Sequence, residues 1–144
     1  MPKDYSFGVV PFFKEDSGEI KYLVIQQRAG HWGFPKGHKE NDETDRESAC
    51  RELTEETSVT DFKIVDNEKC FSVSYIAFHP ELKQVDKTVC YYIAQVFDKA
   101  VTPQLSELHT LEWFSYEDAL LKISHPQIKE VLKKADLEIK KLFD

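Results

Sequence analysis

The chain has 144 residues, 41% of them hydrophobic and 31% charged, which is typical of a globular protein and suits a single domain over residues 1–144. Its 26 acidic and 19 basic residues give a net charge of -7 without any basic block, so we expect no stable nucleic-acid binding. The N-terminus has no signal-peptide pattern and no apolar run is long enough to span a bilayer, so we expect no membrane association and a cytoplasmic location.

The first predicted element is a β-hairpin. Residues 6–13 and 22–27 are apolar and β-branched, with the turn sequence Asp16-Ser17-Gly18 between them. Residues 28–41 hold three of the five glycines and are predicted to form a loop.

A helix is predicted over residues 44–57. Thr44 and Glu47 have the spacing of a capping box, and Ala49, Cys50 and Leu53 form an apolar stripe.

The second half of the chain predicts three strands and two helices. The strands cover residues 70–78, 89–97 and 111–114. One helix follows Ser115, a suitable N-cap, over residues 116–123, and a longer one starts at Pro126 with apolar residues at a helical period. This alternation predicts an α/β/α sandwich around a mixed β-sheet.

The three cysteines, Cys50, Cys70 and Cys90, are odd in number and include no CxxC pair. This predicts neither a zinc site nor a disulfide framework, and we expect all three to be reduced and to pack as small apolar side chains.

Three carboxylates lie on one face of the helix predicted over residues 44–57. Glu52, Glu55 and Glu56 stand at positions i, i+3 and i+4, where like charges disfavour a helix, and we find no cationic partner among them at this spacing. A bound Mg²⁺ would relieve the repulsion and attract a polyphosphate to an otherwise acidic protein. The alternative is a solvated acidic helix face.

The spacing around these carboxylates resembles the Nudix box. Gly37, five residues, Glu43, seven residues and the run from Arg51 to Val59 fit that pattern, with Ser58 where the family has glycine. Because that glycine usually forms a left-handed helix cap, we expect a small loss of stability and retained activity.

The resemblance implies roles for the matching residues. Glu52, Glu55 and Glu56 would bind metal and activate water, aided by the carbonyl of Gly37 and by Glu107 from a later loop. Glu43 would pair with Arg51 and hold the loop against the helix. The resemblance implies Mg²⁺ as the cofactor, with Mn²⁺ as the alternative, and leaves Glu52 and Glu55 as equal candidates for the general base.

Residues outside the box indicate which group of Nudix enzymes the chain resembles. The segments His31–His38 and Lys87–Tyr92, together with Glu107 and Trp113-Phe114, are similar to the asymmetrical diadenosine tetraphosphate hydrolases, which release ATP and AMP. That similarity implies a phosphate site formed by His31, Lys36, His38 and Lys87, and adenine stacking on Tyr75 and Tyr91. Leu111 replaces an aromatic residue that many members carry near the adenine, which would weaken stacking.

The expected activity is therefore metal-dependent hydrolysis of a nucleotide by a monomer. Two alternatives stay open: a Nudix pyrophosphohydrolase for a modified nucleoside triphosphate, an RNA 5′ end or a sugar nucleotide, and an inactive nucleotide sensor. The intact box glutamates and Arg51 argue against the sensor.

Overall fold

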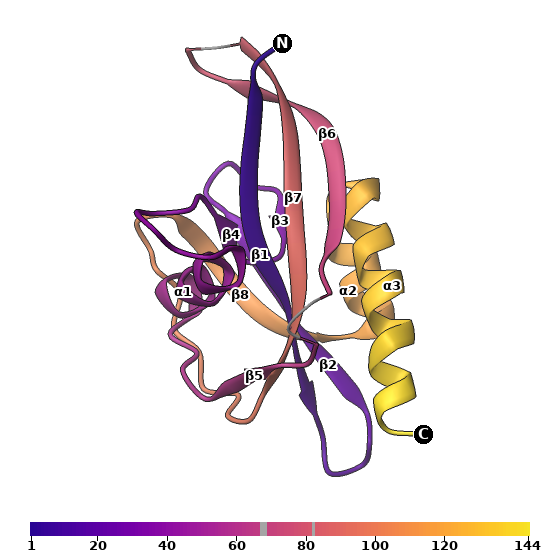
Figure 1. Cartoon of the computed structure of the whole chain (residues 1–144). Coiled ribbons are helices and arrows are strands. Elements are labelled where there is room, and N and C mark those ends of the chain that lie inside the picture. The colour runs from indigo at the N-terminus through magenta and orange to yellow at the C-terminus, as the bar shows by residue number, and fades with distance from the viewer. Residues whose placement is uncertain (67–68, 82) are drawn as a thin grey trace.

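The structure is a computed structural model that describes residues 1–66, 69–81 and 83–144 (Figure 1). Its elements in chain order are β1 (Lys3–Lys14), β2 (Ile20–Gln27), β3 (Trp32–Gly33), β4 (Lys36–Gly37), α1 (Asp45–Thr57), β5 (Phe62–Ile64), β6 (Phe71–His79), β7 (Lys83–Val96), β8 (Leu108–Ser115), α2 (Tyr116–Lys122) and α3 (Pro126–Leu142).

The strands form one mixed sheet. β1 and β7 pair in parallel from Lys3 opposite Asp86 to Phe12 opposite Gln95, whereas the other pairings are antiparallel. The predicted hairpin is confirmed, because β1 and β2 are joined by a short turn in which Gly18 has a φ of +94°. β1 and β7 run side by side along the length of the molecule in Figure 1.

Helices cover both faces of the sheet, which confirms the predicted α/β/α sandwich. On one face, buried side chains of β1 and β7 pack with those of α2 and α3. On the opposite face, Ala49 and Leu53 of α1 pack against Val9 and Tyr92 of the same two strands. In the described part of the chain, no helix combines the length and apolar character that a membrane crossing requires.

The predicted ends of α1 are confirmed. The Thr44 hydroxyl accepts the Glu47 N–H at 3.1 Å, and the Glu47 carboxylate accepts the Thr44 N–H at 2.9 Å, which completes the capping box. At the other end Ser58 has a φ of +66°, the left-handed conformation that the family's glycine adopts without strain.

The sheet is larger than the sequence predicts. β7 begins at Lys83 rather than at residue 89, because its mainly polar first residues are held in the sheet by pairing with β1 and β6. β1 likewise spans Lys3–Lys14 rather than residues 6–13, and its Pro11 lies between the residues that pair with β4 and those that pair with β2. A proline is tolerated there because that side of the strand needs no ladder hydrogen bond.

The expectation of three reduced cysteines is wrong. Cys70, just before β6, and Cys90 of β7 form a disulfide with Cα atoms 5.7 Å apart, and only Cys50 of the three is free. An odd count allows one pair and a leftover thiol, and antiparallel pairing of β6 with β7 brings the two cysteines together. Such bonds persist mainly in oxidising compartments, so this one does not support the cytoplasmic expectation.

Candidate active site

The three predicted metal-binding glutamates of α1, Glu52, Glu55 and Glu56, separate into an inner pair and an outer one. Glu56 is 2% exposed, and its carboxylate accepts the Lys36 backbone N–H at 3.1 Å. Burial, followed by the charges of Glu52 and Glu107, raises the pKa of Glu56 to about 8. Burial also raises the pKa of Glu52, whereas the Glu55 side chain is about half exposed. Two carboxylates therefore face the interior of the site without a full complement of positive charge.

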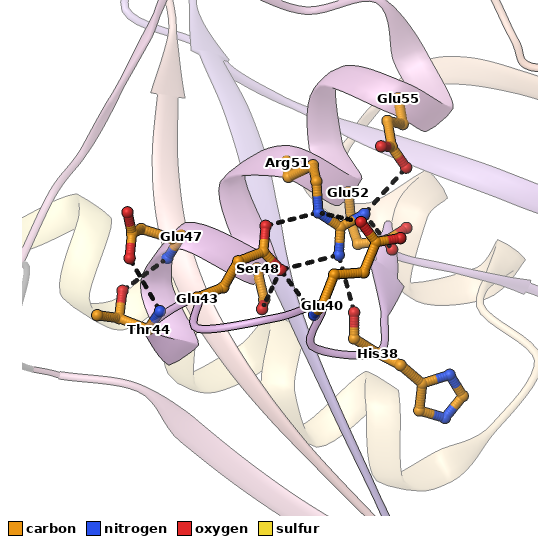
Figure 2. Close-up of polar contacts among 9 residues, drawn as sticks. All are labelled: His38, Glu40, Glu43, Thr44, Glu47, Ser48, Arg51, Glu52 and Glu55. Atoms are coloured by element: carbon orange, nitrogen blue, oxygen red, sulfur yellow. Dashed lines mark hydrogen bonds and ion pairs between the residues drawn. The ribbon is translucent and has the colours of Figure 1, made fainter.

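Arg51 is the cation that organises the outer side of this cluster (Figure 2). Its guanidinium contacts Glu43 at 2.7 Å, as the resemblance implied, and both Glu52 and Glu55 at 3.0 Å. It also donates to the His38 carbonyl at 2.8 Å, which ties the loop before α1 to the helix.

These contacts correct one expectation from the sequence. We predicted that no cation stands among the glutamates at helical spacing, yet Arg51 precedes Glu55 by one turn and pairs with it. The Arg51 hydrogen bonds, together with the Glu40 backbone N–H, hold the pKa of Glu43 at about 2. Glu43 is therefore a permanent counter-ion of Arg51.

Gly37 lies against the Glu52 carboxylate. β4 pairs with β1 through Phe7 opposite Gly37, and the same strand lies beside Glu52 and Glu56 of α1. A Cβ atom at Gly37 would overlap all three atoms of the Glu52 carboxylate. The Nudix box needs glycine here because no other residue lets the backbone approach the carboxylate so closely.

The loop before β8 brings Glu107 to the same place. Its backbone bonds to the end of α1, since the Thr102 and Gln104 N–H groups donate to the Thr57 and Glu56 carbonyls at 2.9 and 3.0 Å. Glu107 thereby lines one cavity of about 530 Å³ with Gly37, Glu52 and Glu56. We call this the acidic cavity.

The donor set of the acidic cavity fits a hard divalent cation. Three carboxylates and a backbone carbonyl are oxygen ligands of the kind that Mg²⁺ prefers. Burial, followed by the charges of Glu52 and Glu107, raises the pKa of Glu56, and a cation bound beside these carboxylates would offset that repulsion. Among the described residues no three acidic or histidine side chains already converge at metal-binding distance. Glu55 in particular points to Arg51 and does not line the cavity.

The four basic residues predicted to bind phosphate are brought together beside the carboxylates. His31, Lys36, His38 and Lys87, with Gln27, line both the acidic cavity and a neighbouring cavity of about 750 Å³. We call these five residues the shared wall. Burial, then the charges of His125 and Lys36, lowers the pKa of His31, and burial followed by the charge of Lys87 lowers that of Lys36.

The neighbouring cavity is lined by aromatic side chains, and we call it the aromatic cavity. Tyr75 lies parallel to His125 with ring centroids 6.3 Å apart, and His31 lies 5.6 Å from His125. Tyr91 is only 1% exposed and packs edge-on against Phe34, so it supports the wall and has almost no free face for stacking.

His125 was not among the predicted site residues, and Leu111 lies elsewhere than predicted. The signal for His125 was its position just before Pro126, where it is the N-cap residue of α3. Leu111 packs in the cluster on the α1 face of the sheet, away from the aromatic cavity on the α3 face. The expected loss of stacking through Leu111 therefore has no basis in this fold.

Comparisons with known proteins agree with this geometry. A family model described as the NUDIX domain matches residues 2–135. The mouse protein named bis(5'-nucleosyl)-tetraphosphatase [asymmetrical] is 33% identical over 125 residues, covering 83% of this chain and 81% of its own length. The crystal structure of a C. elegans Ap4A hydrolase binary complex superposes with a TM-score of 0.82 at 25% identity, covering 95% of this chain and 98% of that one.

A more distant structure shares the fold alone. The E. coli dihydroneopterin triphosphate pyrophosphohydrolase gives a TM-score of 0.71 at 16% identity, covering 93% of this chain and 96% of that one. Because the family model covers residues 2–135 and the box from Gly37 to Val59 lies within them, the chain belongs to the Nudix family of pyrophosphohydrolases.

Proposed function

We propose that the chain hydrolyses dinucleoside polyphosphates asymmetrically, with diadenosine tetraphosphate cleaved to ATP and AMP. The observation that carries this proposal is the junction of the acidic and aromatic cavities along the shared wall. A substrate with a long phosphate chain and a base can lie across both, with its phosphates over the cations between them. The relatives named as asymmetrical tetraphosphatases support the same substrate.

Each part of such a substrate has a matching surface. The cations of the shared wall suit phosphate oxygens, because charged donors make the stronger hydrogen bonds. The parallel rings of Tyr75 and His125 provide a place for a base, where stacking contributes about 1–3 kcal/mol per base. Both cavities are lined by residues of one copy of the chain, and the proposal is that the protein acts as a monomer.

Glu52, Glu56, Glu107 and the Gly37 carbonyl would hold Mg²⁺, or Mn²⁺ in its place. When bound, such an ion offsets phosphate charge and acidifies a coordinated water. Glu55 would join this set only after leaving Arg51. Of the two candidates for the general base we favour Glu52, because it lines the acidic cavity and burial moves its pKa toward the working pH.

The test is hydrolysis of diadenosine tetraphosphate with Mg²⁺ in ¹⁸O-labelled water. We expect ATP and AMP as products, with the label in AMP alone. Nucleoside triphosphates, 5′-triphosphate RNA and a sugar nucleotide serve as competing substrates. Turnover of any of these at a comparable or higher kcat/KM would contradict the dinucleoside proposal, and inertness toward all of them would leave the sensor alternative.

A matched pair of variants separates chemistry from folding. Glu56→Gln removes a carboxylate from the acidic cavity, whereas Glu112→Gln makes the same change on the exposed side of β8. Only the first should lose turnover.

A further inference from the structure

Asp4 joins two residues of the shared wall. Its Oδ1 lies 2.8 Å from Nε2 of His38 and its Oδ2 lies 2.7 Å from Nζ of Lys87. The parallel pairing of β1 with β7 fixes Asp4 opposite Lys87, and His38 reaches the same carboxylate from the loop after β4. Three segments far apart in the sequence therefore meet at one carboxylate group.

The carboxylate is ionised and acts only as an acceptor. Burial by itself would raise the pKa of Asp4, but the hydrogen bonds and charges of Lys87 and His38 outweigh it and lower that pKa. Because an ionised carboxylate cannot donate, Nε2 of His38 must carry the hydrogen in this contact.

The Lys87 ammonium is held by two oxygens and keeps one donor in reserve. Lys87 is 8% exposed, and its Nζ also lies 2.7 Å from Oγ of Ser6. An ammonium has three hydrogens. With Asp4 and Ser6 engaged, the third is left for the cavities that Lys87 lines.

We propose that Asp4 is a positioning residue of the phosphate site, which holds the Lys87 ammonium so that its third N–H meets a phosphate oxygen and fixes the orientation of the His38 ring beside it. This inference rests on the proposed function, in which the shared wall contacts the phosphate chain. Nothing in the Nudix box points to Asp4, because it lies on β1 outside the segment from Gly37 to Val59.

Charge and position make opposite predictions for Asp4. As a negative charge beside a polyphosphate, Asp4 weakens binding, so its removal alone would lower KM. As the partner of a buried ammonium it keeps Lys87 in one place, and a lysine without that partner changes rotamer or draws in water. The contacts of 2.7 Å to Lys87 and 2.8 Å to His38 favour the positional effect.

Two substitutions separate these effects. D4E keeps the charge and moves the carboxylate by one methylene, whereas D4N keeps the shape and removes the charge. D86N makes the same change as D4N on β7, at the residue beside Lys87 that faces the opposite side of the sheet, and serves as the control. Thermal midpoints of all variants monitor folding.

Two measurements report how well the phosphate site binds phosphate groups. The first is the affinity for inorganic tripolyphosphate by calorimetry without metal, which does not depend on the nucleotide substrate. The second is the split of KM and kcat for diadenosine tetraphosphate with Mg²⁺. We expect D4N and D4E each to weaken tripolyphosphate binding and to raise KM about tenfold, with kcat within about threefold of the wild type.

A double-mutant cycle tests whether Asp4 acts through Lys87. In a K87M background, adding D4N should change the tripolyphosphate affinity by less than about twofold. The K87M substitution also removes the buried ammonium that D4N would leave without its partner. The comparison of K87M with the double variant can therefore be made even if D4N alone unfolds.

The inference is overturned if D4E binds tripolyphosphate as the wild type does, if D4N binds it more tightly, or if the wild type does not bind it. Failure of the wild type to cleave diadenosine tetraphosphate, with the tripolyphosphate effects intact, would overturn the proposed function and leave the role of Asp4 standing.

Discussion

Replacing Gly37 by alanine should abolish activity while leaving the fold in place. The new methyl group would overlap the carboxylate of Glu52, which is a flexible side-chain end and can move aside. The backbone of Gly37 does not lie in the left-handed region, so alanine itself is not strained there. The substitution therefore displaces one carboxylate of the acidic cavity and leaves the backbone where it is.

The size of that displacement sets the expected loss. Ordinary contact between carbon atoms is about 3.5–4.0 Å, so Glu52 must retreat by about 1 Å or more. A shift of about 1 Å in a catalytic group costs about 100-fold in rate. We therefore expect Gly37→Ala to reduce kcat/KM at least about 100-fold, with a thermal midpoint close to that of the wild type.

Two other glycines provide controls for this experiment. At Gly33 an added methyl group meets no atom within 4 Å, so Gly33→Ala should leave the thermal midpoint unchanged. At Gly8 it would overlap the backbone carbonyl of Pro35, which cannot move without breaking the pairing of β1 with β4, so Gly8→Ala should lower the midpoint.

The assay is steady-state hydrolysis at saturating Mg²⁺, with thermal melts of the three alanine variants. Activity of Gly37→Ala within about fivefold of the wild type would refute the argument that close approach to Glu52 is what the box glycine provides. A large fall in its melting temperature would refute the separation of activity from folding.

Three further outcomes follow from the site. Glu56→Gln should lower turnover about 100- to 1000-fold by removing a metal ligand. In the metal-free wild type, the free energy of unfolding should fall as pH rises from 4.5, the ordinary pKa of this group, through about 8, its pKa in the folded protein. Chemical denaturation should show this pH dependence in the wild type and not in the variant. The pKa of Glu43 is lowered from 4.5 to about 2, so this group stabilises the fold above pH 4.5 and loses that effect as pH falls through 2. The difference in urea midpoint between wild type and Glu43→Gln should therefore shrink as pH falls from 4.5 to about 2. A constant difference would contradict the pairing with Arg51. Thiol titration of the unfolded, unreduced protein should find one free thiol, and reduction of Cys70–Cys90, which are 20 residues apart, should destabilise it by about 3 kcal/mol; three thiols before reduction would exclude the disulfide.

The sequence was most informative where local chemistry determines structure. The capping box at Thr44, the helix start at Pro126 and the turn at Gly18 each depend on a few neighbouring residues, and all are present in the structure. The glutamates of α1 and Glu43 were identified by spacing along one short segment, which a helix and its preceding loop reproduce directly.

Features that depend on pairing between distant segments were not predictable from local sequence. The early start of β7 at Lys83 reflects hydrogen bonding to β1 and β6, because its polar residues carry no apolar signal for a strand. The Cys70–Cys90 disulfide likewise follows from the register of β6 against β7. Asp4 became visible only once the parallel pairing set it opposite Lys87.

Side-chain direction was the second limit. Tyr75 and Tyr91 are both tyrosines of neighbouring strands, yet one is partly open beside His125 and the other is buried. Glu55 shares a helix face with Glu52 and Glu56, but Arg51 draws its carboxylate outward. Spacing identifies which residues share a face, and the surrounding partners decide where their charged ends lie.

The backbone bonds between the loop before β8 and the end of α1 couple two halves of the acidic cavity. The Gln104 N–H is bonded to the carbonyl of Glu56, and the Arg28 side chain holds the Leu105 carbonyl from the opposite side at 2.6 Å. One connected set of hydrogen bonds therefore holds Glu107 and Glu56 in place. Substitutions that loosen Arg28 should combine non-additively with changes at Glu56, even though these two side chains belong to separate stretches of the chain.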